Sequence, residues 1–311
     1  MNSIGTETIV VGIDGSANSD AALDWAVDAA SLQGLRLHVF SAGVHGSHGD
    51  DPDAGFVDAM IAREARAVAD KNLAAAKLRA AERSPGLVVT THSDLEPAAR
   101  SLVAYSSDAH SIVLGRSGHN AWTGSLLGAV ASKVVSQAVC PVAVVRGPTR
   151  ATSTAHGVAV AIDGSSTSKV ALAHAFHHAS LRGVDLRVIH ASWTRATVSR
   201  TPDTRADQVN QEAILVSEAL AGWAERYPDV SVEVSLPVGP TVLAITGAAR
   251  DAELLVMGCR RHGLPRVLLG SVSRGVLKHA PCTVLIVRER VEHPGPTVTF
   301  GSVSGASLAT R

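Results

Sequence analysis

The stretch Ser111-Ile-Val-Leu-Gly-Arg-Ser-Gly-His-Asn-Ala-Trp-Thr-Gly-Ser-Leu-Leu-Gly128 decides the fold. It begins with a short apolar run that has the length and content of a buried strand. A polar loop containing Gly115 and Gly118 follows, and a helical pattern begins near Gly128. Glycines let a backbone approach an anion closely, and the free N–H groups of a helix's first turn then face it. The stretch therefore predicts a strand, a loop and a helix that together cradle a phosphate.

The same plan recurs in the second half of the chain. There, Glu253-Leu-Leu-Val-Met-Gly258 is followed by a loop and by Gly270-Ser-Val-Ser273. Asp14-Gly-Ser16 likewise reappears as Asp163-Gly-Ser165, at nearly the same offset. A period close to half of the chain predicts a tandem duplication in which each copy is a domain.

The composition is that of a globular protein. The chain has 311 residues, of which 46% are hydrophobic and 18% are charged, and 28 basic side chains balance 28 acidic ones. This balance leaves no excess of positive charge that would attract nucleic acid or an anionic membrane surface. The three cysteines lie far apart, which fits a reducing compartment, and no apolar run is long enough to span a bilayer. We therefore expect a cytoplasmic protein that binds neither nucleic acid nor a membrane.

Glycine, proline and polar residues mark the boundaries of the two copies. We expect one domain over residues 1–146, a linker over 147–156, a second domain over 157–288 and a disordered tail over 289–311. Within each copy, apolar runs alternate with helical patterns, which predicts an α/β fold with a parallel sheet and helices on both faces. The expected strands are 8–13, 35–40, 87–91, 112–114 and 140–145 in the first copy, and 158–162, 186–189, 230–234, 254–257 and 284–287 in the second.

An aspartate follows the first strand of each copy, at Asp14 and at Asp163. In open parallel sheets, ligands bind beyond the carboxyl ends of the strands, where the strand order reverses. Asp14 and the glycine loop after Leu114 both lie at such ends, so we expect them to converge on one ligand. There a carboxylate can accept hydrogen bonds from a ribose hydroxyl or an adenine amine. A structural interpretation stays open, because aspartate in this position also caps helices and stiffens Asp-Gly turns.

Other polar clusters have simpler interpretations. His174, His177 and His178 share a helix at spacings typical of metal ligands, but no acidic residue accompanies them. We therefore expect a solvated helix face there rather than a metal site. Cys259 lies in the second glycine loop beside arginines, so a redox role is a hypothesis. A Walker-type Gly-Lys-Ser/Thr loop and known catalytic motifs are absent, so we assign no catalytic and no metal-ligating residue.

Taken together, these residues resemble the universal stress protein family in its tandem, ATP-binding form. The family's motif is Gly-x2-Gly-x9-Gly-Ser/Thr after the fourth strand, with an aspartate after the first, and the resemblance covers about residues 6–146 and 157–288. It implies an adenine nucleotide alpha-hydrolase-like fold in each half, with a five-stranded parallel sheet in the order 3-2-1-4-5. It also implies that the short apolar fifth strands, 142–145 and 284–287, pair with each other.

The resemblance further implies which residues hold the ligand, ATP with Mg²⁺. In the family the aspartate contacts the nucleoside, a valine of the second strand contacts adenine through its backbone, and the glycine motif wraps the phosphates. In the first copy the corresponding residues are Gly12, Asp14, Val39, Gly115, Arg116, Gly118, Gly128 and Ala129. In the second copy they are Asp163, Val188, Gly258, Arg260, Gly270, Ser271, Val272 and Ser273.

Each copy departs from the motif in its own way. In the first, Gly128 is followed by Ala129 in place of Ser or Thr, which removes one hydroxyl donor to phosphate. A hydrogen bond to a charged group contributes roughly 1.5–3 kcal/mol. In the second copy, Arg261 replaces the middle glycine and the loop is one residue short, although Arg260 and Arg261 add positive charge. We expect the first copy to bind ATP more readily than the second.

The function implied by the resemblance is a stress-response regulator whose ATP occupancy modulates its interactions, with slow or no hydrolysis. It implies a homodimer of the whole chain and a regulatory protein partner that the sequence does not identify. Two alternatives stay open. Degenerate loops in both copies would leave a nucleotide-independent interaction scaffold, and a third interpretation is a weak ATPase.

Overall fold

The computed structural model describes residues 4–43, 54–118, 127–147, 157–192, 202–259 and 269–289. In residues 54–58 and 202–209 it describes the backbone alone. The two expected domains lie within the first three and the last three of these stretches. Most of the expected linker, residues 148–156, and most of the expected tail, residues 290–311, lie outside the described residues.

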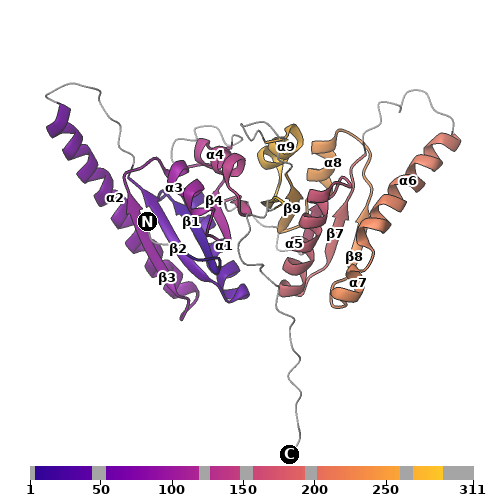
Figure 1. The fold of residues 1–311 in the computed structure, drawn as a ribbon, viewed down its shortest axis with the longest axis horizontal. Helices are drawn as coiled ribbons and strands as arrows, with labels where there is room; N and C mark the ends of the chain where they lie inside the picture. The colour runs from indigo at the N-terminus through magenta and orange to yellow at the C-terminus, as the bar shows by residue number, and fades with distance from the viewer. Residues whose placement is uncertain are drawn as a thin grey trace, which may run out of the picture.

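The two halves repeat one alternation of strands and helices (Figure 1). The elements of the first half are β1 (Thr8–Ile13), α1 (Ala17–Gln33), β2 (Arg36–Ala42), α2 (Ala54–Arg83), β3 (Val89–Asp94), α3 (Ala98–Tyr105), β4 (Ser111–Gly115), α4 (Ala129–Gln137) and β5 (Val142–Val145). Those of the second half are β6 (Val158–Ala161), α5 (Ser166–Arg182), β7 (Leu186–Ile189), α6 (Pro202–Leu220), α7 (Trp223–Arg226), β8 (Val232–Ser235), α8 (Thr241–Ala248), β9 (Leu254–Gly258), α9 (Ser271–His279) and β10 (Thr283–Val287).

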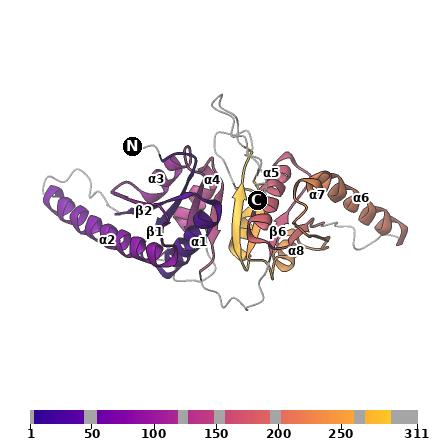
Figure 2. The same cartoon turned by 90° about the horizontal axis from the view of Figure 1, so that it is seen from below.

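One continuous sheet runs through both halves, in the order β3-β2-β1-β4-β5-β10-β9-β6-β7-β8. Within each half the strands are parallel, and their order confirms the expected 3-2-1-4-5. The halves meet where β5 pairs antiparallel with β10, with Ala143 opposite Leu285, so the expected pairing of the fifth strands is confirmed. Figure 2 shows the yellow strand of this junction at the centre, between the two halves.

Apolar side chains cover the two faces of this sheet in two clusters. On one face β1, β2 and β4 pack against α1 and α2, and the corresponding strands of the second half pack against α5 and α6. On the other face the packing helices are α3, α4, α8 and α9. Strands buried on both faces read as continuous apolar runs, which is why β1, β4 and β5 were evident in the sequence. No helix in the described stretches is long and apolar enough to cross a membrane.

The edge strands differ most from expectation. β3 begins at Val89 and β8 at Val232, and both also end later than the sequence predicted. These strands are largely exposed. In β3 every residue after Val89 is polar, so the strand contains no apolar run. A strand without an apolar run gives little signal for its ends.

Candidate functional site

The carboxyl ends of β1 and β4 bring together the two features that the sequence singled out. Asp14 directly follows β1, and Gly118 lies in the loop after β4. A Cβ placed on Gly118 would lie 2.3 Å from Oδ2 of Asp14, which is far inside van der Waals contact. The loop backbone therefore lies directly against the carboxylate, at a separation that only glycine permits without a shift.

The aspartates also make the turn contacts that the structural interpretation predicted. Oδ1 of Asp14 accepts hydrogen bonds from the Ser16 amide, at 3.0 Å, and from the Ser16 hydroxyl, at 2.6 Å. Asp163 does the same with the amide and hydroxyl of Ser165, and its Oδ1 also accepts from Ser168 Oγ at 2.7 Å. One carboxylate oxygen in each copy therefore organises the start of the following helix.

The first glycine of each motif has a packing role that both copies share. A Cβ on Gly115 would lie 2.7 Å from the carbonyl oxygen of Asn18, and one on Gly258 would lie 2.8 Å from that of Thr167. The end of the fourth strand thus packs against the backbone of the first helix. In the first copy, Nδ2 of Asn18 also donates to the carbonyl and the hydroxyl oxygens of Ser117, at 3.0 and 2.8 Å, and holds the start of the loop.

Gly128 closes the loop and begins α4. Its amide donates to the carbonyl of Arg116 at 2.8 Å, and a Cβ on it would lie 3.3 Å from that oxygen. Among the described residues no side chain caps this helix. The first-turn amides of α4 therefore begin next to the backbone of residues 116–118, which is the arrangement that favours an anion. Residues 119–126 lie outside the described part of the chain.

In the second copy the structure describes less of this place, because residues 260–268 lie outside the described part of the chain. Gly270 begins α9, again without a capping side chain in the described stretches, and a Cβ on it would meet none of the described atoms within 4 Å. Ser271 is exposed in the first turn, while Ser273 is buried. Arg260 and Arg261, expected to supply charge to phosphate, lie outside the described residues. The described atoms therefore show no loop closing on the aspartate in this half.

The remaining residues of the expected site lie in or beside the sheet. Gly12 is in β1, where a Cβ would lie 2.7 Å from Leu114 Cδ2, so it has a packing role. The side chains of Val39 and Val188 are fully buried in the core, so any ligand contact there would involve their backbones. Ala129 is exposed at the first position of α4. Val272 is half-buried in α9.

The side chain of Arg116, expected to hold phosphate, reaches the junction between the halves. Its Nη1 donates to the carbonyl of Lys278, near the end of α9, at 3.0 Å. Burial and the neighbouring Arg146 lower the pKa of the Arg116 guanidinium. A cation is favourable at this position, because the last carbonyls of a helix lack intrahelical partners.

Two further arginines at this junction were missed in the sequence. Arg146 follows β5 and donates to the carbonyl of Ala280 at the end of α9. Arg288 follows β10 and donates to the carbonyls of Val135 and Ala138 at the end of α4. Each half thus holds the C-terminal end of the helix that follows the glycine loop in the other half. The available signal was that an arginine follows the fifth strand in both copies.

The expectation of a solvated histidine face on α5 was wrong. His178 is 5% exposed, and its Nδ1 lies 2.9 Å from Nη1 of Arg182. Burial and the nearby Arg182 hold the pKa values of His177 and His178 below the usual range. The described stretches contain no group of three or more His, Cys, Asp or Glu side chains placed to hold a metal ion. His178 packs inside the protein because α5 contacts α1 of the other half as well as the sheet, whereas His174 and His177 are half-buried.

Cys259 lies under the protein surface rather than in an open loop. It is 2% exposed, and its amide donates to the carbonyl of Val287 at 2.9 Å. A thiol with a redox role needs access to an oxidant or to another thiol. The position of Cys259 therefore gives no support to the redox hypothesis.

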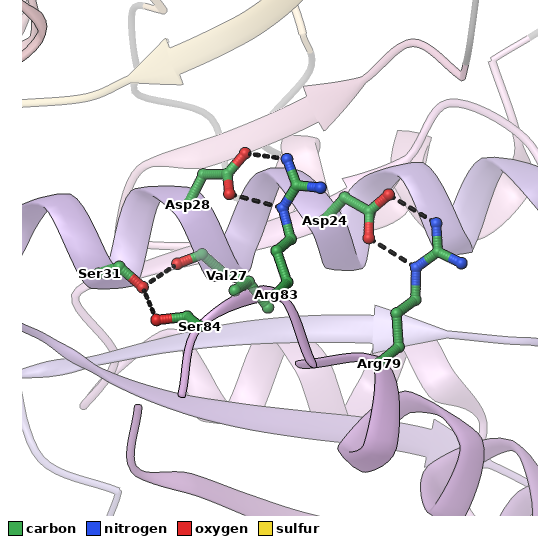
Figure 3. A network of polar contacts seen from close by, with 7 residues as sticks. All are labelled: Asp24, Val27, Asp28, Ser31, Arg79, Arg83 and Ser84. Atoms are coloured by element: carbon green, nitrogen blue, oxygen red, sulfur yellow. Dashed lines mark hydrogen bonds and ion pairs between the residues drawn. The ribbon is translucent and has the colours of Figure 1, made fainter. Parts of the chain in front are cut away.

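Helix α2 borders the site and is fastened to α1. Gly15, with a φ of 81°, lies against the side chain of Asn72, whose Oδ1 would be 2.8 Å from an added Cβ. Farther along, Arg79 pairs with both carboxylate oxygens of Asp24 at 2.6 Å, and Arg83 pairs in the same way with Asp28 (Figure 3). These pairs join the later part of α2 to α1, while Asn72 lies against the turn that follows β1.

Comparison with known proteins agrees with the geometry. A family model described as the universal stress protein family matches residues 5–146 and 156–288. A universal stress protein of Mycobacterium tuberculosis is 36% identical over 293 residues, which cover 90% of this chain and 97% of the relative. One from Mycolicibacterium smegmatis is 34% identical over 287 residues, covering 91% and 97%.

A solved structure shows the same fold over most of the chain. It is a universal stress protein from Archaeoglobus fulgidus, and it covers 92% of this chain and 99% of its own. The TM-score is 0.64 at 21% sequence identity. At this identity the likeness concerns the fold alone.

Proposed function

The chain belongs to the universal stress protein family, and from this premise we propose that its first half binds ATP between Asp14 and the loop that begins at Gly115. The nucleotide acts as a regulatory ligand that changes an interaction surface, with slow or no hydrolysis. We also propose that the whole chain forms a homodimer and serves a protein partner in the cytoplasm.

The approach of Gly118 to Asp14 carries this proposal. The Oδ1 atom of Asp14 is used in the turn with Ser16, whereas Oδ2 is the atom that lies beside Gly118. A carboxylate next to a glycine, which has no side chain to fill the space, suits a nucleoside. The carboxylate oxygens accept hydrogen bonds from hydroxyl and amine groups. A purely structural Asp-Gly turn would not require a glycine on the loop from β4.

The start of α4 supports the phosphate end of the same site. The N-terminus of this helix has a partial positive charge and unsatisfied amides, which suit an anion. Gly128 and Arg116 hold the loop closed there through a 2.8 Å hydrogen bond. Ala129 supplies no hydroxyl, so we expect backbone amides to make the phosphate contacts.

The second half is proposed as the weaker site. Three donors already surround Oδ1 of Asp163, and the sequence has Arg261 where the motif has its middle glycine. Ser271 offers a hydroxyl at the helix start, which the first half lacks. Mg²⁺ would be held mainly by the ATP phosphates, since the described residues place no carboxylate cluster at either helix start.

A titration with ATP and Mg²⁺ by calorimetry tests the proposal. We expect binding by the native chain, and a loss of at least about tenfold in affinity for Gly118→Ala, because the added methyl meets Asp14. Gly247→Ala is the matched control, since a Cβ at that helical position meets nothing within 4 Å. Absence of binding by the native protein would favour the scaffold alternative. If Gly118→Ala still releases phosphate from ATP, the ATPase activity belongs to a contaminant and not to this site.

A further inference from the structure

One face of the sheet in the first half is left open beyond α3. Alternate residues of β2 and β3 point to this face, because side chains alternate along a strand. A cavity of about 780 Å³ lies there, lined by residues of β1, β2, β3 and α3. None of the residues expected to bind nucleotide lines it. The cavity is therefore a separate feature of the first half.

The rings of His38, His92 and Tyr105 line part of this cavity. The ring of His38 meets Tyr105 edge-on, with centroids 5.3 Å apart, and stacks with His92 at 6.4 Å. Phe40 packs beneath them, edge-on to Tyr105 at 5.6 Å. The imidazole of His92 is exposed, so its face is available to a planar ligand.

His38 has a buried ring nitrogen that makes no hydrogen bond with any described residue. Its Nδ1 lies 2.8 Å from the hydroxyl of Thr90, and that hydroxyl donates to the carbonyl of Leu37 at 3.5 Å. When the Thr90 hydroxyl donates to Leu37, the imidazole proton lies on Nδ1 and the lone pair on Nε2. Within the described residues, Nε2 is buried without a hydrogen-bond partner. Because this atom lies beneath the cavity surface, a ligand reaches it only with a small shift of a lining side chain.

Charged groups lie at opposite ends of the cavity. Arg36, at the beginning of β2, is exposed and makes no ion pair with any described residue. Burial and the nearby carboxylate of Asp94, at the end of β3, raise the pKa of the Tyr105 phenol. Near that end, Arg100 is already paired with Glu96 at 2.9 Å. One end thus offers a guanidinium that pairs with no acidic side chain of the described stretches. The other offers the Asp94 carboxylate, whose oxygens accept from the Glu96 amide and the Ser101 hydroxyl and can each accept another bond.

The second half fills the same face with its own side chains. Arg187 and Glu233 take the places of His38 and Thr90 in the paired strands. Nε of Arg187 donates to Glu233 at 3.0 Å, and its Nη1 donates to the carbonyl of Ala248, the residue that corresponds to Tyr105. The duplicated fold can therefore close this face with an ion pair, and in the first half it does not.

We propose that this cavity is a second binding site, for a small elongated aromatic molecule with an acidic group at one end and a hydrogen-bond-donating group at the other. The acidic group pairs with Arg36, the ring stacks on His92, and the donor serves Asp94 or His38 Nε2. The site does not depend on nucleotide binding by the first half.

The test uses a planar probe, a biphenyl with a carboxylate and an amine at opposite ends. Its binding is measured by calorimetry and by the imidazole NMR signals of His38 and His92. Three analogues lack the carboxylate, the amine or the rings. We expect the full probe to bind at least about tenfold more tightly than each analogue, because each loses one contact.

The second half supplies the decisive variant. His38→Arg combined with Thr90→Glu introduces the ion pair that the duplicated fold already tolerates, and it should abolish probe binding. The exposed substitution Arg36→Ala, which cannot disturb the core, should weaken binding only of probes with a carboxylate. Ser217→Ala, on exposed α6, is the control. Failure of every probe to bind the native chain at millimolar concentration would overturn the proposal, and so would equal binding by the double variant.

Discussion

The guanidinium of Arg288 donates hydrogen bonds to the carbonyls of Ala138 and Val135, and so joins the last strand of the second half to the end of α4 in the first. The side chain is 7% exposed, and within the described residues its Nε has no partner. A buried cation at the end of a helix complements the helix dipole and satisfies carbonyls that the helix leaves unpaired.

Replacement of Arg288 by methionine should destabilise the protein. The apolar side chain fills most of the volume but leaves two carbonyls without a donor, so we expect the free energy of unfolding to fall by about 2–3 kcal/mol. Urea unfolding followed by circular dichroism measures this change. Arg250→Met, at an exposed position, is the control. An unchanged or higher midpoint would show that the buried charge costs as much as its hydrogen bonds contribute.

His38 should make stability fall in acid. Burial and the neighbouring His92 lower the pKa of His38 from 6.5 to about 4. The folded state therefore takes up this proton less readily than the unfolded state, and the stabilisation present above pH 6.5 is lost as the pH falls towards 4. The loss has a slope of up to about 1.4 kcal/mol per pH unit.

The variant His38→Asn tests this assignment, because its amide can still donate to Thr90 but does not titrate. Unfolding in urea at a series of pH values should give a shallower dependence than in the native protein. His178 also contributes to the native slope, since burial and Arg182 lower its pKa. Equal slopes in the variant and the native protein would exclude His38 as a source of the dependence.

The two Arg–Asp pairs of Figure 3 should contribute little individually. The side chains of Arg79 and Asp24 are 47% and 25% exposed, so water and salt screen their attraction. A double-mutant cycle with Arg79→Ala and Asp24→Ala should give a coupling of about 0.5–1 kcal/mol at low salt. This coupling should shrink in molar sodium chloride, whereas a salt-independent value would indicate a desolvated pair.

Gly115 should tolerate no side chain, although its φ is ordinary. A methyl group there would lie 2.7 Å from a backbone oxygen of α1, which cannot move as a side chain can. We expect Gly115→Ala to lower the free energy of unfolding by about 1–3 kcal/mol. The matched change Gly247→Ala, in the open turn of α8, should be neutral or stabilising by up to about 1 kcal/mol. Equal effects of the two substitutions would contradict the close packing of β4 on α1.

The fold could be predicted because its signals are local. Buried parallel strands such as β1 and β4 are continuous apolar runs, and Gly34, with a φ of 65°, ends α1 where a left-handed residue is needed. Repetition of these marks in the second half, together with the family resemblance, also gave the strand order and the pairing of β5 with β10. The approach of Asp14 to the glycine loop followed from their shared place at the carboxyl ends of strands.

What the sequence did not reveal depends on how the two halves pack together. Arg116 stands within a phosphate motif, yet its side chain reaches Lys278 of the other half because α9 ends beside it. His178 lies in a helical pattern that looks solvated, yet its side chain is 5% exposed, because α1 of the first half packs against α5. No residue pattern within one copy encodes contacts of this kind.

The most direct test is to measure how much adenine nucleotide each chain binds. The chain is incubated with ATP and Mg²⁺, separated from free ligand and denatured, and the released nucleotide is quantified by mass spectrometry. We predict close to one adenine nucleotide per chain, lost in Gly118→Ala and retained in Ser271→Ala. Release of no nucleotide from the native protein, or an equal amount from Gly118→Ala, would contradict a site between Asp14 and the first glycine loop.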